Sequence, residues 1–300
     1  IKKQFFEKQE NGQYQFKSEF DSQKKLESYF NQSESKSVKQ LDLLEKLYGL
    51  QCEVLFLHDP KNKKLYHPRI SIFTSNTFQS LDNKTKSAIE TLYIEFFYHR
   101  HTEFWKQQAM KKLPALLSCT NMMVCGEDLG MIPDSVPQVM KELQILSLEI
   151  ERMPKDSQVE FTNLKKLPYL SVCTTSTHDM STIRGWWEED RDKTQRYYNN
   201  VLKIHGNPPF EADINVCRTI IERHLNSHAI WTIIPLQDWF SIEERFRVKD
   251  IHQERINVPS NPKHFWCYRM HIALEDLLSQ TDFNEKIKEL VNHSGRNLEL

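Results

Sequence analysis

Apolar residues in the second part of the chain fall into short blocks that polar segments separate. Four blocks have the length of buried strands, and each runs through a polar loop into a helix-like stretch. The blocks are residues 121–125, 146–153, 169–173 and 229–234. Strand, polar loop and helix repeated in this order are typical of parallel βα units. We therefore expect an α/β protein, although the second block alternates in polarity and fits a strand covered on both faces less well.

Helical periodicity is clearest over residues 83–117. The expected apolar stripe there consists of Ile89, Leu92, Tyr93, Phe96 and Phe97. Asp82 is the expected N-cap, and Pro114 is expected to end or break this helix. A capping box formed by Ser135 and Gln138 predicts a further helix. We also expect helices over residues 183–202 and 263–280, and a polar loop over residues 31–39.

Composition and charge exclude several classes of protein. Lys and Arg number 40 against 41 Asp and Glu, so no overall positive field favours a nucleic acid or an anionic membrane. No apolar run approaches the roughly 20 residues of a membrane span. Six scattered cysteines without a Cys-x-x-Cys pair indicate reduced thiols and a cytoplasmic location, and they argue against disulfides or a metal site. Because the chain opens on Ile1, we expect it to be the downstream part of a longer protein.

Acidic side chains follow two of the predicted strands. Glu127 follows the first, and Asp179, with His178 beside it, follows the third. In a barrel, alternate strands aim their terminal residues into one bowl, so these carboxylates could face each other. Two carboxylates and a histidine suit glycosyl transfer. The structural alternative is that Glu127 favours the following helix N-terminus and Asp179 caps its own helix. For Trp186, core packing and stacking on a sugar ring are both open.

Ordered motifs give the chain a family resemblance. The segments CGEDLGMIP (125–133), STHD (176–179), RGWW (184–187) and PLQD (235–238) resemble the 4-α-glucanotransferases of glycoside hydrolase family 77, the amylomaltases or disproportionating enzymes. YHPRI (66–70), ERINVP (254–259) and NPKH (261–264) are similar to the larger branch of that family, which includes the plant cytosolic disproportionating enzyme.

The resemblance implies a retaining enzyme on a (β/α)₈ barrel. The chain would then be the C-terminal half of the barrel, about strands five to eight, with helical insertions. Residues 118–300 would form this half, and residues 1–117 would be a helical insertion region after the fourth strand. The family nucleophile, an Asp in an Arg-x-Asp-His segment that ends the fourth strand, does not occur in this sequence. It is expected upstream of Ile1, so these residues alone are expected to be inactive.

The resemblance also implies roles for individual residues. Glu127 corresponds to the general acid/base, Asp179 to the carboxylate that stabilises the transition state, and His178 to a contact on the sugar before the cleavage point. The remaining residues expected near substrate are Gln237, Asp238, Arg255, Asn257 and Trp186.

The implied activity transfers α-1,4-linked glucosyl units from maltose or maltodextrin donors to glucan acceptors such as glycogen or starch-like polysaccharide. It requires no cofactor and no metal. Two alternatives stay open from the sequence: a glucan-binding relative without catalysis, and a barrel enzyme that hydrolyses starch.

Overall fold

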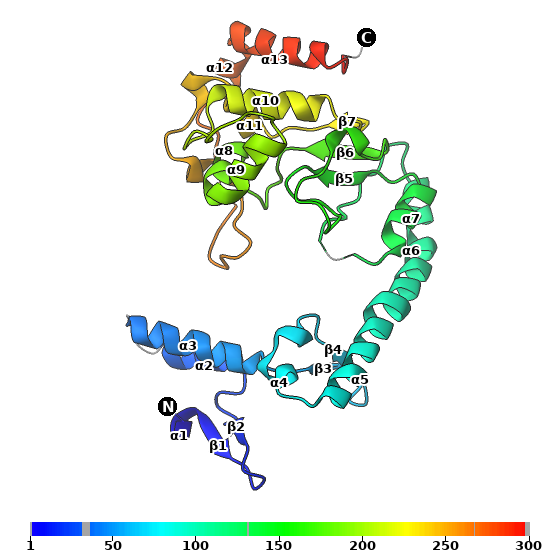
Figure 1. Ribbon diagram of the computed structural model, residues 1–300, viewed down its shortest axis with the longest axis vertical. Coiled ribbons are helices and arrows are strands. Elements are labelled where there is room, and N and C mark those ends of the chain that lie inside the picture. Colours follow the sequence, from blue (N-terminus) through cyan, green and yellow to red (C-terminus); the bar gives the residue numbers. More distant parts are fainter. Residues whose placement is uncertain (1, 32–36, 131, 267, 298–300) are drawn as a thin grey trace. The chain divides into compact units, whose positions relative to one another are not determined.

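The computed structural model describes residues 2–31, 37–130, 132–266 and 268–297 (Figure 1). These divide into two compact units, Ile1–His101 and Thr102–Leu300. The domain division expected at residue 117 stays a prediction. Most of the loop expected over residues 31–39 lies outside the described residues.

The first unit contains two small antiparallel pairs of strands, β1 with β2 and β3 with β4. Its strands are β1 (Phe6–Lys8), β2 (Tyr14–Phe16), β3 (Phe56–His58) and β4 (Tyr66–Pro68). Its helices are α1 (Lys2–Phe5), α2 (Gln23–Phe30), α3 (Val38–Gln51), the 3₁₀ turn η1 (Ile72–Thr74), α4 (Asn76–Gln79), α5 (Asn83–Ile94) and the π-helix η2 (Glu95–Arg100). One cluster of buried side chains joins α1, α2 and α3, and a second lies between η1, α4 and α5.

The second unit is built on a parallel sheet. Its strands are β5 (Ser147–Ile150), β6 (Ser171–Thr174) and β7 (Trp231–Thr232). Its helices are α6 (His101–Ser118), α7 (Ser135–Glu142), α8 (Ile183–Glu189), α9 (Arg191–Asn200), α10 (Ile214–Leu225), α11 (Leu236–Phe240), α12 (Leu274–Leu278) and α13 (Thr281–His293), with 3₁₀ turns η3 (Leu164–Lys166), η4 (Glu244–Phe246) and η5 (Ile251–Glu254).

The strands of this sheet follow one another in the order β5–β6–β7, all parallel (Figure 1). Ser147 pairs with Ser171, and this register fixes β5 against β6. A parallel bridge between Cys125 and Leu146 adds the segment around Cys125 on the other side of β5. Three of the four predicted strands thus form, as β5, β6 and β7, whereas residues 121–125 make only the bridge at Cys125 and no strand. Because they are parallel, their C-terminal ends lie at one edge of the sheet, and the polar loops after them meet there.

The second predicted strand, which alternates in polarity, contains buried glutamates. Glu149 and Glu151 are only 6% and 2% exposed. Lys155 binds Glu149 at 2.8 Å. Arg223 and the Tyr197 hydroxyl bind the two oxygens of Glu151 at 2.6 and 2.5 Å. Partnered carboxylates can lie inside a protein, so this strand is covered on both faces despite its sequence.

The long helical stretch over residues 83–118 begins as predicted and ends differently. Asp82 is the N-cap, and its carboxylate accepts the amide hydrogen of Thr85 at 3.0 Å. The prediction that Pro114 ends or breaks the helix is wrong, because α6 continues through it. Proline removes a single backbone donor. Leu113 and Leu117 of the same helix pack against the buried face of α7, which offsets that loss.

The apolar stripe of this stretch is interrupted. Ile89 and Tyr93 are buried as predicted, whereas Leu92 is 41% exposed. The π-helix η2 follows within three residues. A π-helical turn contains more residues than an α-helical one, so the faces before and after η2 are not in the same register.

Two other helix predictions are also wrong in part. Ser135 is the first residue of α7 instead of its cap, and its hydroxyl donates to the Thr102 carbonyl at 3.0 Å. The cap is Asp134. Of the helix expected over residues 263–280, only α12 forms. Residues 263–266 and 268–273 lie in a loop instead, and the ring of Trp266 in this loop contacts a residue of the site described below.

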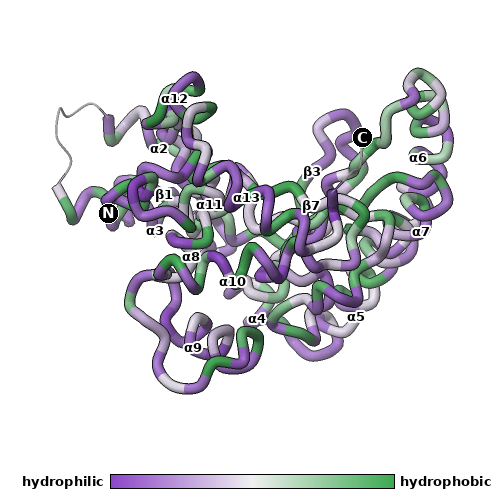
Figure 2. The backbone as a smooth tube through the Cα atoms, turned by 90° about the horizontal axis from the view of Figure 1, so that it is seen from above, coloured by the Kyte–Doolittle hydropathy of each residue, from purple (hydrophilic) through white to green (hydrophobic). Residues whose placement is uncertain are grey.

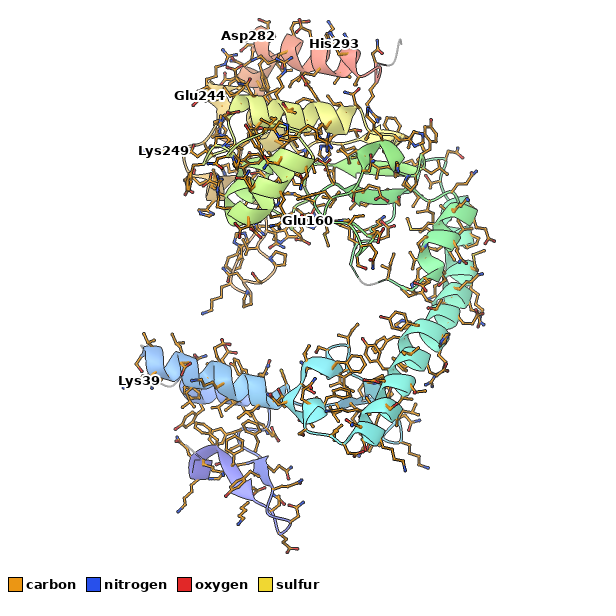
Figure 3. The ribbon with its side chains drawn as sticks, viewed as in Figure 1. Lys39, Glu160, Glu244, Lys249, Asp282 and His293 are labelled. Atoms are coloured by element: carbon orange, nitrogen blue, oxygen red, sulfur yellow. The ribbon has the colours of Figure 1, made fainter. Side chains whose placement is uncertain are left out.

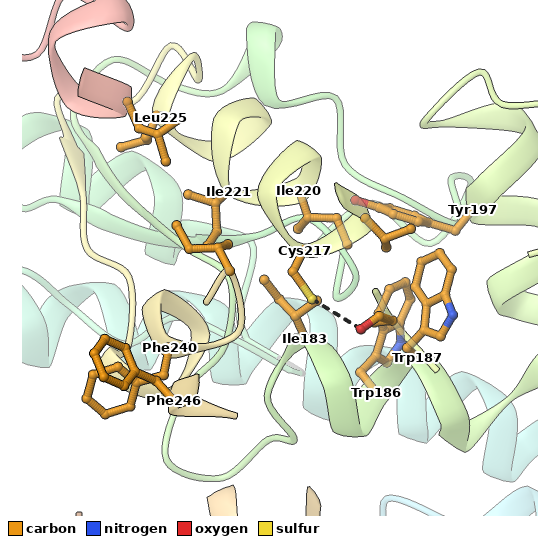
Figure 4. Packing of buried hydrophobic residues seen from close by; sticks show 14 of the residues in the cluster. Ile183, Trp186, Trp187, Tyr197, Cys217, Ile220, Ile221, Leu225, Phe240 and Phe246 are labelled. Carbon is orange, nitrogen blue, oxygen red and sulfur yellow. Dashed lines mark hydrogen bonds between the residues drawn. The ribbon is translucent and has the colours of Figure 1, made fainter. Parts of the chain in front are cut away.

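The main core of the second unit lies beside the sheet, among α8, α9, α10, α11 and α13 (Figure 4). Trp187 and Ile221 at its centre are fully buried. Green and purple segments alternate along the tube in Figure 2, as expected for helices with one apolar face. Figure 3 labels six polar side chains that all lie exposed: Lys39, Glu160, Glu244, Lys249, Asp282 and His293.

Candidate functional site

The loop after β6 is fastened at both ends by one buried carboxylate. Asp238 at the start of α11 has no exposed surface. One of its oxygens accepts hydrogen bonds from Thr175 at 2.5 Å and Ser176 at 3.1 Å. The other accepts the amide hydrogen of Ile183, the first residue of α8, at 2.8 Å. The bonds of Asp238 therefore fix the loop that carries the STHD motif, and its predicted contact with substrate stays a prediction.

Asp179 projects from this loop with both carboxylate oxygens engaged. Its side chain is 47% exposed, and that of His178 is 50% exposed. The Asn257 amide donates to one oxygen at 2.6 Å, and His178 Nε2 lies 3.3 Å from the other. The Asn257 backbone N–H also donates to the His178 carbonyl at 3.0 Å. The structure therefore brings together three of the residues predicted from the sequence.

Arg255 connects these residues to the start of α8. Its guanidinium donates to the Asn257 carbonyl at 3.0 Å and approaches the Asp179 carbonyl at 3.5 Å. A further N–H donates to the Ser181 hydroxyl at 2.5 Å, and Glu189 lies 3.3 Å away. One side chain thus holds both segments of the site. Sequence reasoning missed Ser181 and Glu189, because nothing in their spacing points to Arg255.

A buried ion pair supports the start of α8, one of the two segments that Arg255 joins. Arg184 of α8 donates to Glu254, the last residue of η5, and both side chains are less than 8% exposed. The Thr182 hydroxyl donates to the other Glu254 oxygen at 2.7 Å. Burial raises the pKa of Glu254, while Thr182 and Arg184 act to lower it. Gln237, also predicted from the sequence, is buried and donates to the Glu254 carbonyl at 3.3 Å.

Two cavities border this group of residues. One of about 210 Å³ is lined by His178, Gln237 and Glu254 among others. Another of about 370 Å³ is lined by Asp179 and Arg255, together with Trp186. Hydrogen-bonding groups of both charge signs beside apolar surface suit a neutral ligand rich in hydroxyl groups better than an ion.

Trp186 lies mostly in the core. It is 8% exposed, and its ring meets the Tyr197 ring edge-on at 5.0 Å. The Arg152 guanidinium lies over it at 5.4 Å. Packing therefore accounts for most of its surface, and its predicted contact with a sugar stays a prediction.

Glu127 lies at the same sheet edge, two strands from β6. It follows the segment that bridges to Leu146, is exposed, and accepts the Leu129 amide hydrogen at 2.8 Å. Strands lie about 4.8 Å apart, so the two strand ends are separated by about 10 Å. Gly126 allows α7 to approach, since a Cβ there would lie 3.0 Å from Met140 Cε. Within the described ranges, no hydrogen bond or ion pair joins Glu127 to Asp179.

The described part of the chain contains no group of three or more His, Cys, Asp or Glu side chains arranged to hold a metal ion. None of its helices combines the length and the apolar character that crossing a membrane requires.

Comparison with known proteins shows which family the chain matches. Residues 18–275 match the family described as 4-alpha-glucanotransferase, glycoside hydrolase family 77. The 4-alpha-glucanotransferase DPE2 of Oryza sativa subsp. japonica is 36% identical over 286 residues, which make up 94% of this chain and 30% of the rice protein. The 4-alpha-glucanotransferase of Chlamydia pneumoniae is 29% identical over 189 residues, 62% of this chain and 35% of that protein.

A solved structure, amylomaltase from Streptococcus agalactiae in complex with acarbose, aligns with a TM-score of 0.49 at 17% identity. The alignment covers 64% of this chain and 35% of that one. The chain spans about a third of the length of the relatives it matches. The matched range 18–275 includes every candidate residue from Glu127 to Asn257, and the chain belongs to the 4-alpha-glucanotransferase family.

Proposed function

We propose that the protein containing this chain transfers α-1,4-linked glucosyl units between glucans with retention of configuration. The observation that carries the proposal is the placement of Asp179. Its carboxylate is half exposed at the end of a parallel strand and is held by Asn257 at 2.6 Å, within a chain of this family. A carboxylate held in a fixed position stabilises the positive charge that develops on a sugar when its glycosidic bond breaks.

Glu127 acts as the general acid and base. In the first step it protonates the departing glycosidic oxygen while the nucleophile bonds to the sugar's anomeric carbon. In the second step it removes the proton of an acceptor hydroxyl, which displaces the nucleophile and restores the α configuration. The nucleophile is an aspartate of the protein outside this sequence. The exposure of Glu127 at the edge that also carries Asp179 supports this assignment, and the strand separation leaves space for a sugar ring between them.

The three parallel strands and the segment that bridges to Leu146 support a finer assignment of the fold. They follow one another in order, with α7 before β5 and α8, α9 and α10 between β6 and β7, as in consecutive units of a (β/α)₈ barrel, although the connection from β5 to β6 holds only the 3₁₀ turn η3. We assign them to about strands five to eight, so that residues 118–300 form the C-terminal half of a catalytic barrel. Maltose and maltodextrins are the proposed donors and starch-like polysaccharide or glycogen the acceptors, in the cytoplasm and without a metal or cofactor.

The test compares variants of the whole protein on maltotriose. E127Q is expected to lower the rate of transfer about 10²- to 10⁴-fold, the usual contribution of a general acid. Glu142, an exposed glutamate at the end of α7, provides the matched control, and E142Q should transfer normally. A full rate for E127Q would refute the assignment. A ladder of longer glucans indicates transfer, whereas shorter products alone would indicate hydrolysis, and binding without turnover a glucan-binding protein.

An activated donor separates the two carboxylates. α-Glucosyl fluoride releases fluoride without needing a proton, so E127Q should still release fluoride from it. D179N should lose activity toward both donors, because charge develops on the sugar in either case. If the two variants respond alike to the fluoride donor, the proposed division of roles is wrong.

A further inference from the structure

A tryptophan outside the residues considered so far lies against the site. Trp266 follows the segment that carries Asn257, and its ring centroid lies 4.6 Å from that of His178, tilted by 41°. The residue is nevertheless 62% exposed. No hydrogen bond joins its indole N–H to another described residue. An exposed tryptophan with a free N–H beside a polar site is unusual, because burial of a large ring is strongly favourable.

The loop before Trp266 is folded in a way that brings it to this position. The backbone N–H of Asn257 donates to the His178 carbonyl, and this bond fixes the start of the loop beside the site. The Asn261 amide donates to the Val258 carbonyl at 2.9 Å, and the His264 amide to the Asn261 carbonyl at 3.0 Å. The His264 ring also contacts the Ile256 carbonyl at 3.0 Å. Backbone and side-chain bonds therefore close this loop on itself and direct its end toward His178.

The two tryptophans of α8, Trp186 and Trp187, do not share this position. Trp186 is 8% exposed, and Trp187 is fully buried with its indole N–H bonded to the Pro209 carbonyl at 3.0 Å. Both contribute to the core. Among these three rings, Trp266 has most free surface, since His178 occupies only part of it.

We infer that Trp266 is a specificity-determining residue that forms the aromatic platform for one glucosyl unit, the neighbour of the unit that His178 contacts. The inference rests on the proposed function. A glucose ring presents an apolar face of C–H groups with hydroxyl groups around its edge. An indole offers an apolar face of matching size and an N–H that can donate to a hydroxyl. The substrate class is therefore a glucan of at least two linked units, not a single glucose.

A simpler role is that Trp266 only shields His178 and holds its ring. The two roles differ in what the side chain must provide. Shielding requires apolar volume, which leucine supplies nearly as well as an aromatic ring. A platform requires a flat face, which phenylalanine supplies and leucine does not.

The experiment measures maltoheptaose affinity by titration calorimetry in the whole protein and in W266F, W266L and F265L. Phe265 is the matched control, because it is 78% exposed, is adjacent in the chain and has no ring contact with His178 among the described residues. W266L is expected to weaken binding by roughly 5- to 10-fold, and W266F and F265L by less than about 3-fold. Equal losses in W266F and W266L, or a loss in F265L as large as in W266L, would overturn the inference. If W266L does not fold, W266M takes its place.

Kinetics separate this inference from the proposed function. With α-glucosyl fluoride, whose single ring does not reach the platform, W266L should keep the wild-type KM, whereas with maltoheptaose its KM should rise. A loss of the same size with both donors would indicate shielding of His178 and refute the platform. If the wild-type protein transfers no glucan, the proposed function fails, and the calorimetric comparison still decides whether Trp266 binds glucan. Absence of binding by the wild-type protein would overturn the inference.

Discussion

Removing Arg184 tests how the buried ion pair supports the site. In R184M the Glu254 carboxylate would stay buried and keep only the Thr182 hydroxyl as a side-chain partner. Methionine fills much of the space of the arginine stem, so the main loss is the charge and its hydrogen bonds. Breaking a buried pair by removing one partner costs about 3–5 kcal/mol, because an uncompensated charge stays behind. We expect R184M to destabilise the contact between α8 and η5 by about that amount.

The double variant R184M/E254Q distinguishes two causes of the lost stability, the unpaired charge of Glu254 and the packing lost with the arginine side chain. Glutamine keeps the shape of Glu254 without its charge. If the unpaired Glu254 carboxylate is the cause, the double variant should recover more than half of the stability lost in R184M. Equal stability of the single and double variants would refute this reasoning.

The stability that R184M loses should also depend on pH. Burial raises the folded-state pKa of Glu254 above its unfolded value. The stability that this group contributes is therefore fully present below the unfolded pKa and is lost as pH rises through the folded pKa. Arg184 lowers the folded pKa, so its removal raises that pKa further and lets Glu254 take up a proton more easily. The R184M defect should be smaller at about pH 5 than at about pH 8.

Hydrogen exchange of the whole protein provides the assay. Protection of the α8 and η5 amides reports local opening, which suits a protein with more than one compact unit. In R184M the exchange of these amides should accelerate, while that of the first unit stays unchanged. A defect of the same size at both pH values would contradict the argument.

Two further predictions concern single side chains. N257A removes the amide bond to Asp179 and should lower transfer about 10- to 100-fold, since a hydrogen bond to a charged group contributes about 1.5–3 kcal/mol; the rate on maltotriose measures this, and an unchanged rate would refute a positioning role. Burial raises the pKa of the Cys173 and Cys217 thiols to about 12, so a thiol reagent at about pH 8 should leave both unmodified in the native protein. Mass spectrometry should find label on Cys52, Cys119 and Cys125, the exposed cysteines among the residues that the structure describes.

The sheet could be predicted from the sequence because buried parallel strands require apolar residues on both faces. Residues 169–173 satisfy this requirement and give a clear pattern. The strand β5 gives a weak one, since Glu149 and Glu151 lie inside and their partners come from distant parts of the chain. No local pattern indicates whether a glutamate will find such a partner, so the alternation suggested one polar face.

The site was predictable only as far as motifs identify it. Strand ends indicated Glu127 and Asp179, and the family resemblance added Arg255 and Asn257. Arg184 and Glu254 lie in quoted motifs, but their pairing left no signal, because they are 70 positions apart and a charged residue on a helix is usually exposed. Trp266 lay within a predicted helix, and only the folded loop shows that it reaches His178.

The bond between Asn257 and Asp179 has a consequence for synthesis on the ribosome. The two residues are 78 positions apart, so the ribosome makes Asp179 before Asn257. At about 5–20 residues per second, the interval is roughly 4–16 s. The loop after β6 gains its partners one after another in this interval, Asp238 first, then Arg255 and last Asn257. This part of the site therefore cannot be complete until translation has passed Asn257, the last of these residues.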